Sequence, residues 1–301
     1  MFFQFLYQLI YSPTVNKVLR NVLRLFGVKG QLQLPPSGIV SFDIGKNQKF
    51  RLHTNQTNYV TKLLFWNGYE SFEYVSIFEK LINKINIFYD VGANIGLYSI
   101  VAGKVNTSVA IYSFEPSVGP HHYLEKNIRL NKLNNVKLEK MALGAFDGRL
   151  KFSEVLNSKY TYLKHNLAGE GNSSQKKSDK LFQDFEVEVT TIDTYVTVHK
   201  HKIDLIKIDT EGTEHLILQG AINTIKKMRP IIIGETLYNL IEAELEKTLK
   251  PLGYQFFNHT EAGLKHVETI IRTADDGVRN CFFVPEEKVN LVEEFVVKEK
   301  D

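Results

Sequence analysis

Three acidic side chains stand out because they directly follow two apolar runs. Asp209 and Glu211 come after the run Leu205–Ile208, and Glu235 ends the run that begins at Ile231. If both runs form adjacent parallel strands, the three carboxylates meet at one edge of a sheet. Carboxylates at strand tips are solvated or functional and seldom belong to a core. Crowding raises the pKa of at least one of them, as a general base requires, so we predict proton-transfer chemistry here.

A second cluster has the residue types of a turn that binds a nucleoside-like ligand. An apolar run containing Asp90 leads into Gly92-Ala-Asn-Ile-Gly96, after which a helical pattern begins. Glycines let the backbone turn tightly and approach a ligand, and the start of a helix offers unpaired N–H groups. The next apolar run ends in Glu115. An acid at that place accepts hydrogen bonds from two ribose hydroxyls, so the cluster predicts an adenosine-type ligand.

Both clusters lie in a part of the chain where apolar runs alternate with helical patterns from residue 86 onward. Such alternation is typical of a parallel sheet covered by helices on both faces, with ligands at the carboxyl ends of the strands. We expect strands at residues 87–91, 109–114, 136–140, 203–208, 230–234, 254–258 and 280–284. We expect helices at residues 97–105, 118–131, 215–226 and 240–249. The polar stretch 157–184 is expected to be a long loop, either a lid over the site or a surface insertion.

The first 85 residues divide into two segments ahead of this pattern. We expect residues 1–36 to form an amphipathic helical leader and residues 37–85 to form an extension with a hairpin and a helix, which leaves residues 86–301 as the main domain. The leader carries four cations and no acid. We keep two interpretations open: the leader packs on the main domain or a partner, or residues 1–30 contact a membrane surface peripherally.

Composition excludes several classes of protein and indicates the cellular compartment. The net charge of +3 is too small to argue for nucleic acid, and no cluster of Cys and His has the spacing of metal ligands. The single cysteine, Cys281, cannot form an internal disulfide, which suits a reducing compartment. No stretch of 18 apolar residues is present. We therefore expect a cytoplasmic protein, with the membrane surface as the alternative, and the sequence leaves the oligomeric state open.

In this order, the motifs resemble those of the FkbM-type family of S-adenosylmethionine-dependent methyltransferases. The resemblance runs from about residue 69 to residue 285, and the leader is not part of it. The matching motifs are Asp90-Val-Gly-Ala-Asn-Ile-Gly-Leu-Tyr98, Ser113-Phe-Glu-Pro116, Thr191-Ile-Asp-Thr-Tyr195, Ile208-Asp-Thr-Glu-Gly-Thr-Glu214, Gln219-Gly-Ala221 and Asn280-Cys-Phe-Phe-Val-Pro285. The resemblance implies an α/β fold with a doubly wound, seven-stranded, Rossmann-like sheet whose last strand is antiparallel. It also implies methyl transfer to oxygen, commonly on sugars or polyketide hydroxyls.

The resemblance also implies which residues surround the cofactor. Around its methionine part would lie Asp90, Gly92, Asn94 and Gly96. Around its ribose and adenine would lie Glu115, Pro116, Ser117, Ala142 and Leu143, and the segment that closes over the cofactor would contain Tyr69 and Glu70.

We therefore predict an O-methyltransferase acting on a hydroxyl of a glycan or glycolipid-like acceptor, with Asp209, Glu211 and Glu235 as candidates for the base. Alternatively, these acids hold Mg²⁺ against a vicinal diol, since Mg²⁺ prefers oxygen ligands. A rival of another class is a non-catalytic adaptor with a vestigial site, whose leader docks on a membrane or a glycan-assembly complex. A nicotinamide dehydrogenase is the third alternative, but Asn94 breaks the Gly-x-Gly-x-x-Gly spacing that this class uses.

Overall fold

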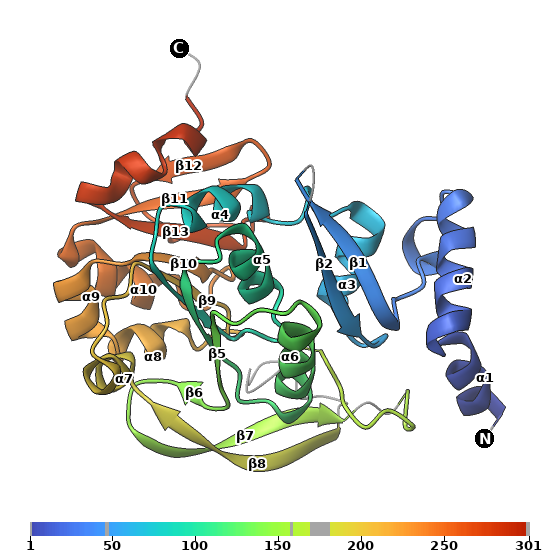
Figure 1. Ribbon diagram of the computed structural model, residues 1–301. Helices are drawn as coiled ribbons and strands as arrows, with labels where there is room; N and C mark the ends of the chain where they lie inside the picture. The colour runs from blue at the N-terminus through green and yellow to red at the C-terminus, as the bar shows by residue number, and fades with distance from the viewer. Residues whose placement is uncertain (1, 46–47, 157–158, 169–180, 299–301) are drawn as a thin grey trace.

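A computed structural model describes residues 2–45, 48–156, 159–168 and 181–298, and its centre is one large sheet (Figure 1). The strands of this sheet are β3 (Ile87–Val91), β4 (Ala110–Phe114), β5 (Val136–Glu139), β9 (Leu205–Ile208), β10 (Ile231–Glu235), β11 (Tyr254–Thr260), β12 (Gly263–Val267) and β13 (Asn280–Pro285). Their order is β12-β11-β13-β10-β9-β3-β4-β5. The last strand, β13, lies antiparallel between β10 and β11.

All seven predicted strands are present, and the predicted antiparallel last strand is confirmed. The sheet has eight strands rather than seven, because β12 folds back on β11 as an antiparallel edge strand. This strand has five residues and only Leu264 and Val267 are large and apolar, so its sequence lacks the apolar run by which the others were recognised.

Helices cover both faces of the large sheet (Figure 1). One face packs against α4 (Val75–Ile82), α5 (Leu97–Val105) and α6 (Val118–Leu130). The other packs against α7 (Ile192–His199), α8 (Glu214–Gln219), α9 (Ile222–Met228) and α10 (Glu242–Leu249). Successive strand residues such as Phe88 and Tyr89 enter opposite cores, so the doubly wound α/β arrangement predicted from the alternation is confirmed.

The predicted single helix at residues 215–226 is wrong, because the chain forms α8 and α9 instead. The break lies at Gly220, where an added Cβ would be 2.0 Å from the carbonyl oxygen of Gly144. A side chain from α7 caps the second helix, since the carboxylate of Asp193 accepts hydrogen bonds from the backbone N–H groups of Asn223 (3.0 Å) and Thr224 (2.7 Å). The close approach and the cap both depend on distant segments, which helical periodicity does not report.

A second, three-stranded sheet consists of β6 (Ala142–Leu143), β7 (Gly148–Leu156) and β8 (Leu181–Thr190), in the order β6-β8-β7. The expectation of a loop over 157–184 is therefore wrong at its end, because residues 181–184 pair with β7. Residues 157–158 and 169–180 of that expected loop lie outside the described residues. The part between them, 159–168, returns to the body, where Leu167 is buried and its N–H donates to Thr57 Oγ1 (2.8 Å).

The predicted hairpin is present as β1 (Gly38–Ile44) and β2 (Gln48–Thr54), and it is followed by an unpredicted helix, α3 (Tyr59–Asn67). Phe50 and Leu52 of β2 are fully buried in the same core as α4 and α5. The side-chain amide of Asn131 in the turn after α6 also bonds to the backbone N–H and carbonyl groups of Arg51. The hairpin thus shares one hydrophobic core with the large sheet.

The leader folds as two helices, α1 (Phe2–Ile10) and α2 (Pro13–Leu25), at one side of the molecule (Figure 1). Within the described part of the chain, no helix combines the length and the apolar character needed to cross a bilayer. Four short 3-10 helices, namely η1 (Gly30–Leu32), η2 (Lys250–Leu252), η3 (Glu286–Leu291) and η4 (Glu293–Phe295), complete the helical elements of the described residues.

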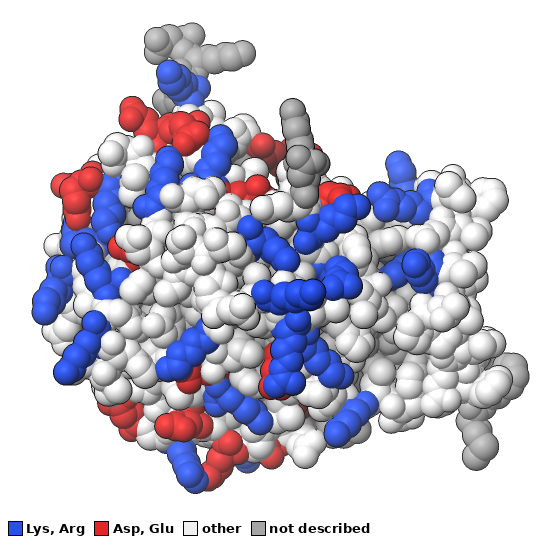
Figure 2. Space-filling view, in the orientation of Figure 1, with Lys and Arg blue, Asp and Glu red and all other residues white. Residues whose placement is uncertain are grey.

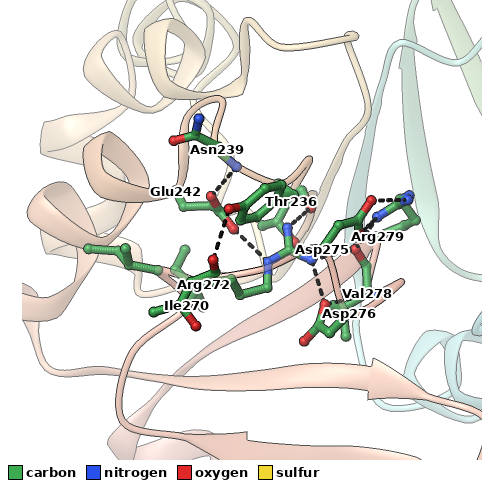
Figure 3. Close-up of polar contacts among 12 residues, drawn as sticks. Thr236, Asn239, Glu242, Ile270, Arg272, Asp275, Asp276, Val278 and Arg279 are labelled. Carbon is green, nitrogen blue, oxygen red and sulfur yellow. Dashed lines mark hydrogen bonds and ion pairs between the residues drawn. The ribbon is translucent and has the colours of Figure 1, made fainter.

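The side chain of Arg272 makes hydrogen bonds to several segments that follow β10 in the sequence (Figure 3). Its guanidinium Nε donates to Glu242 on α10 at 2.6 Å, and Nη2 donates to the carbonyl of Thr236 at 2.6 Å. Its Nη1 contacts Asp276 at 2.9 Å and the carbonyl of Val278 at 2.7 Å. The Arg272 and Glu242 side chains are only 8% and 4% exposed, so their buried ion pair holds Arg272 against α10, while the bond to Thr236 holds it at the residue that follows β10.

Candidate active site

A cavity of about 440 Å³ opens at the carboxyl ends of β3, β4 and β9. Its size lies in the range of small-molecule sites, and its place is the one expected for a doubly wound sheet. Because β9 and β4 lie on opposite sides of β3, the side chains at their tips enter the cavity from different directions. The small sheet adds apolar side chains to the lining, among them Leu143, Leu150 and Val189.

The turn after β3 forms the floor of the cavity through Gly92 and Asn94. Gly92 has φ +74°, and an added Cβ would lie 1.9 Å from the carbonyl oxygen of Asp209, so only glycine lets the two turns approach this closely. Asn94 has φ +50°, and its side-chain oxygen accepts hydrogen bonds from the N–H of Ile95 (2.8 Å) and from Asn58 Nδ2 (3.2 Å). These contacts hold a left-handed backbone in place at the cavity wall.

Asp90 and Gly96 shape this turn from behind and do not line the cavity. Asp90 Oδ2 accepts from the backbone N–H (3.0 Å) and the hydroxyl (2.6 Å) of Ser99, so it caps the first turn of α5. Burial raises the pKa of Asp90, while the charge of Lys207 and the Ser99 bonds oppose the rise. Gly96 has φ +92°, and a Cβ there would lie 2.5 Å from a methyl carbon of Leu124.

Glu115 enters the cavity from the tip of β4, and Pro116 and Ser117 line the cavity beside it. Its two oxygens accept hydrogen bonds from the backbone N–H groups of Asn94 (2.8 Å) and Ser117 (2.9 Å). Burial raises the pKa of this carboxyl, and both bonds oppose that rise. Each oxygen keeps a further lone pair, so the carboxylate can accept from two hydroxyls of a ligand.

A buried lysine connects the acids around the tip of β9. Lys207 is 4% exposed, and its Nζ lies 3.2 Å from Asp209 Oδ2 and 3.7 Å from Asp90 Oδ1. Burial lowers the pKa of Lys207, but the charges of Asp209, Asp90 and Glu73 outweigh burial and raise it, so the ammonium stays protonated. The ammonium also lies 5.1 Å from the ring centre of Tyr98. Asp209, with a side chain 45% exposed, lines the cavity in a position that Lys207 fixes.

Lys207, Glu73 and Tyr98 line the cavity but were missed by the sequence analysis. Glu73 precedes α4 with φ +42°, and its Oε2 accepts from the Tyr98 hydroxyl at 2.6 Å. One signal was available, because Lys207 is the only charged residue in the run Leu205–Ile208. A cation in a strand buried on both faces requires a nearby countercharge.

Glu211 and Glu235 differ in their relation to the cavity. Glu211 lines the cavity, whereas Glu235 lies at the tip of β10, beside Asp209, and outside the lining. Burial, and then the negative charges of Asp209, Glu211 and Glu214, raise the pKa of Glu235 to about 9. The predicted rise in one pKa is thus confirmed, although burial contributes more than the crowding from which it was predicted.

Two further expectations do not match the cavity. Tyr69 is buried in the core, and its hydroxyl donates a hydrogen bond to Glu79 at 2.6 Å. Glu70 is exposed and lies outside the cavity lining. The residues of this segment that line the cavity are Phe72 and Glu73 instead. Ala142 and Leu143, by contrast, do line the cavity.

The Mg²⁺ alternative finds no support, because no group of three or more His, Cys, Asp and Glu in the described part of the chain could hold a metal ion.

Known proteins resemble this chain over about half of its length. A profile of the methyltransferase FkbM domain matches residues 90–261. "Methyltransferase 1" of Beauveria bassiana is 25% identical over 145 residues, which are 44% of this chain and 56% of that protein. The tRNA(Phe) (4-demethylwyosine(37)-C(7)) aminocarboxypropyltransferase of Methanocaldococcus jannaschii is 26% identical over 153 residues, which are 49% of this chain and 57% of that protein. This chain therefore spans little more than half the length of these relatives.

Solved structures with similar folds are more distant. The methyltransferase FkbM of Methylobacillus flagellatus has a TM-score of 0.43 and 16% identity, covering 66% of this chain and 43% of that chain. A SAM-dependent O-methyltransferase of Thermotoga maritima has a TM-score of 0.36 and 10% identity, covering 75% and 66%. The family profile matches more than half of the chain, and the protein therefore belongs to the FkbM family of methyltransferases.

Proposed function

We propose that this chain is an S-adenosylmethionine-dependent O-methyltransferase that methylates a hydroxyl of a glycan or a glycolipid-like acceptor. One observation carries the proposal. A single cavity combines the buried carboxylate of Glu115 at the tip of β4 with the lysine-fixed carboxylate of Asp209 at the tip of β9. The first suits a ribose, and the second suits proton removal from an acceptor hydroxyl.

The residues of the cavity fit the chemistry of S-adenosylmethionine. Glu115 offers two acceptor oxygens to ribose hydroxyls, and Ala142 and Leu143 offer an apolar wall to a flat base. The carboxylates of Asp209 and Glu211 outnumber the ammonium of Lys207, which favours a cationic ligand at this end. When bound, the cofactor supplies an activated methyl group on a positively charged sulfur.

The protein must then align an acceptor oxygen and take up its proton. Alignment contributes on the order of 7–11 kcal/mol, and a positioned base contributes about 10²–10⁴-fold in rate. Asp209 is our choice for the base, because its partly exposed carboxylate lines the cavity and Lys207 Nζ fixes it at 3.2 Å. Glu235 is the weaker candidate, because it lies outside the cavity lining and because burial and the charges of Asp209 and Glu211 raise its pKa.

The acceptor class rests on the family resemblance and on one side chain at the cavity. Tyr59 lines the cavity with 65% of its surface exposed, so it offers an aromatic face to a sugar ring. The relative from Methanocaldococcus jannaschii is named for transfer of an aminocarboxypropyl group to tRNA, so the assay must distinguish this product from a methylated one.

The test is transfer of a labelled methyl group from S-adenosylmethionine to nucleotide sugars, free glycans and lipid-linked glycans, with the products identified by mass. We expect a mass gain of one methyl group and a loss of about 10²-fold or more in rate for Asp209→Asn. Asp204→Asn is the matched control, because Asp204 lies at the opposite end of the same strand and accepts backbone N–H groups outside the cavity.

Two results would contradict the proposed methyl transfer, and two more would change the roles of the acids. A folded chain that neither binds S-adenosylmethionine nor transfers any group supports the adaptor alternative. An aminocarboxypropyl product assigns the same cavity to a different transfer. Equal rates for Asp209→Asn and Asp204→Asn at several pH values exclude Asp209 as the base. Loss of activity in chelator, with recovery on adding Mg²⁺, would restore the metal alternative.

A further inference from the structure

The leader helices carry an apolar surface that faces away from the body. Ten of the eighteen exposed large hydrophobic side chains of the described residues lie between residues 3 and 32. On α1 they include Phe5 and Leu9, and on α2 and its end they include Val18, Val22 and Leu25. Leu25 is 88% exposed. Single exposed apolar residues are ordinary, but a patch that continues along two successive helices marks an interaction site.

The leader attaches to the body through its other face, which is polar and aromatic. The buried residues of α2 are Asn16 and Arg20. Asn16 bonds to the N–H of Ser37 (2.8 Å) and to the carbonyl of Pro35 (3.1 Å), and the Arg20 guanidinium lies 4.9 Å from the ring centre of Phe65. A surface helix of a globular protein ordinarily buries its apolar face, so this arrangement is reversed. Packing on the body therefore does not account for the apolar surface of the two helices.

Charge points to an anionic partner. The sequence contains no Asp or Glu before Asp43, and the leader exposes Lys17 and Lys29, whereas the Arg24 guanidinium lies 5.4 Å from the ring centre of Phe65 on the body. In Figure 2 the lobe formed by α1 and α2 shows blue and white atoms but no red. Helix α1 itself contains no charged residue. Apolar burial and a cationic rim are the two features by which helices bind at the headgroup level of anionic membranes.

We propose that α1 and α2 dock in the plane of an anionic lipid bilayer, with Phe5, Leu9, Val22 and Leu25 among the headgroups and Lys17 and Lys29 against lipid phosphates. The two helices have 9 and 13 residues, about 14 and 20 Å at 1.5 Å per residue, so they lie on the bilayer and do not cross it. We expect docking to be reversible, because salt screens its cationic part.

Helix α3 lies between the attached face of the leader and the cavity. Its first residues, Tyr59 and Val60, line the cavity, while Phe65 and Trp66 at its other end contact the leader through Arg20 and the carbonyl of Leu34. The helix has nine residues, about 14 Å. A docked leader would therefore hold the cavity close to the bilayer surface. The docking proposal stands without the proposed methyl transfer and is tested separately from it.

Vesicle flotation of the full chain tests the proposal, with phosphatidylcholine vesicles that contain or lack phosphatidylglycerol. We expect stronger flotation with phosphatidylglycerol, and binding that weakens in high salt without vanishing. The double variant Phe5→Ser/Leu25→Ser should bind at least about 100-fold more weakly, because two largely exposed apolar side chains no longer enter the bilayer. The matched control is Val198→Ser/Ile271→Ser, which removes apolar side chains of similar exposure from the body.

The cationic part is tested by Lys17→Gln/Lys29→Gln, for which we expect about 20- to 30-fold weaker binding to anionic vesicles. Lys226→Gln/Lys227→Gln removes two exposed lysines of α9 and should bind like the unaltered chain. The proposal is overturned if the full chain fails to float with either vesicle, or if the leader and body variants bind equally. Sedimentation without lipid must show a monomer, since a dimer dissociated by Phe5→Ser/Leu25→Ser assigns the surface to a second copy of the chain.

Discussion

Replacing Glu235 by glutamine should stabilise the protein at neutral pH and leave it unchanged at acid pH. The carboxyl lies at the tip of β10, where burial and the charges of Asp209, Glu211 and Glu214 raise its pKa from 4.5 to about 9. Its Oε2 has no hydrogen-bond partner among the described residues. The folded chain therefore keeps a proton on Glu235 that the unfolded chain has already released at neutral pH.

Proton linkage gives the direction in which this group changes the free energy of unfolding with pH. Between pH 4.5 and about 9 the folded state binds more protons than the unfolded state at this group, so the free energy of unfolding falls as pH rises. The full effect is about 1.4 kcal/mol per pH unit, which from pH 4.5 to pH 7 amounts to about 3 kcal/mol. Because Glu235 is only partly buried and its neighbours titrate with it, we expect an observed gain of about 1–3 kcal/mol for Glu235→Gln at pH 7.

The assay is urea unfolding of the wild type and the variant at pH 4, 5.5, 7 and 8.5. The quantity compared is the change with pH of the difference in free energy of unfolding between the two chains, so a constant effect of the amide cancels. We expect the difference to grow with pH. Glu244→Gln, an exposed change on α10, is the control and should show little difference at any of these values. A Glu235→Gln difference that stays constant from pH 4 to 8.5 would refute the raised pKa.

Three further substitutions test contacts that support the site. Lys207→Met leaves the buried carboxylate of Asp90 without its cation, so we expect the free energy of unfolding, measured by urea unfolding, to fall by about 3–5 kcal/mol. An unchanged free energy of unfolding would show that the buried pair is dispensable. Gly92→Ala places a Cβ 1.9 Å from a backbone oxygen at φ +74°, so we expect a loss of about 1–3 kcal/mol and weaker cofactor binding by calorimetry. Arg272→Met breaks the buried pair with Glu242 and should lower the melting temperature clearly, and a melting temperature equal to the wild type would contradict that role.

The elements that could be predicted from the sequence are those with strong local patterns. The strands around Asp90, Glu115 and Asp209 are largely apolar runs, so their ends, and hence the tips that border the cavity, lie within a few residues of the prediction. Strand β12 and the break at Gly220 were not predictable in this way. The first is an edge strand with few apolar residues, and the second depends on the backbone of Gly144 pressing against the glycine.

The site was predicted only as far as local motifs reach. Glu115 and Asp209 line the cavity because each follows a strand directly. Glu73 reaches the same cavity from a segment before the first strand of the large sheet, through a contact with Tyr98 that no sequence spacing reports. For the leader, periodicity predicts an amphipathic helix but not which face packs on the body. Buried Asn16 and Arg20 show that the polar face does.

The central claim is that the cavity at the tips of β3, β4 and β9 binds S-adenosylmethionine, with Glu115 on its ribose. Calorimetric titration of the full chain with this cofactor tests it most directly. We expect saturable binding for the wild type and for Glu139→Ala, which removes an acid from the adjacent strand tip outside the cavity lining, and binding at least about tenfold weaker for Glu115→Ala. No binding by the folded wild type, or equal affinities for the Glu115→Ala and Glu139→Ala chains, would contradict the account.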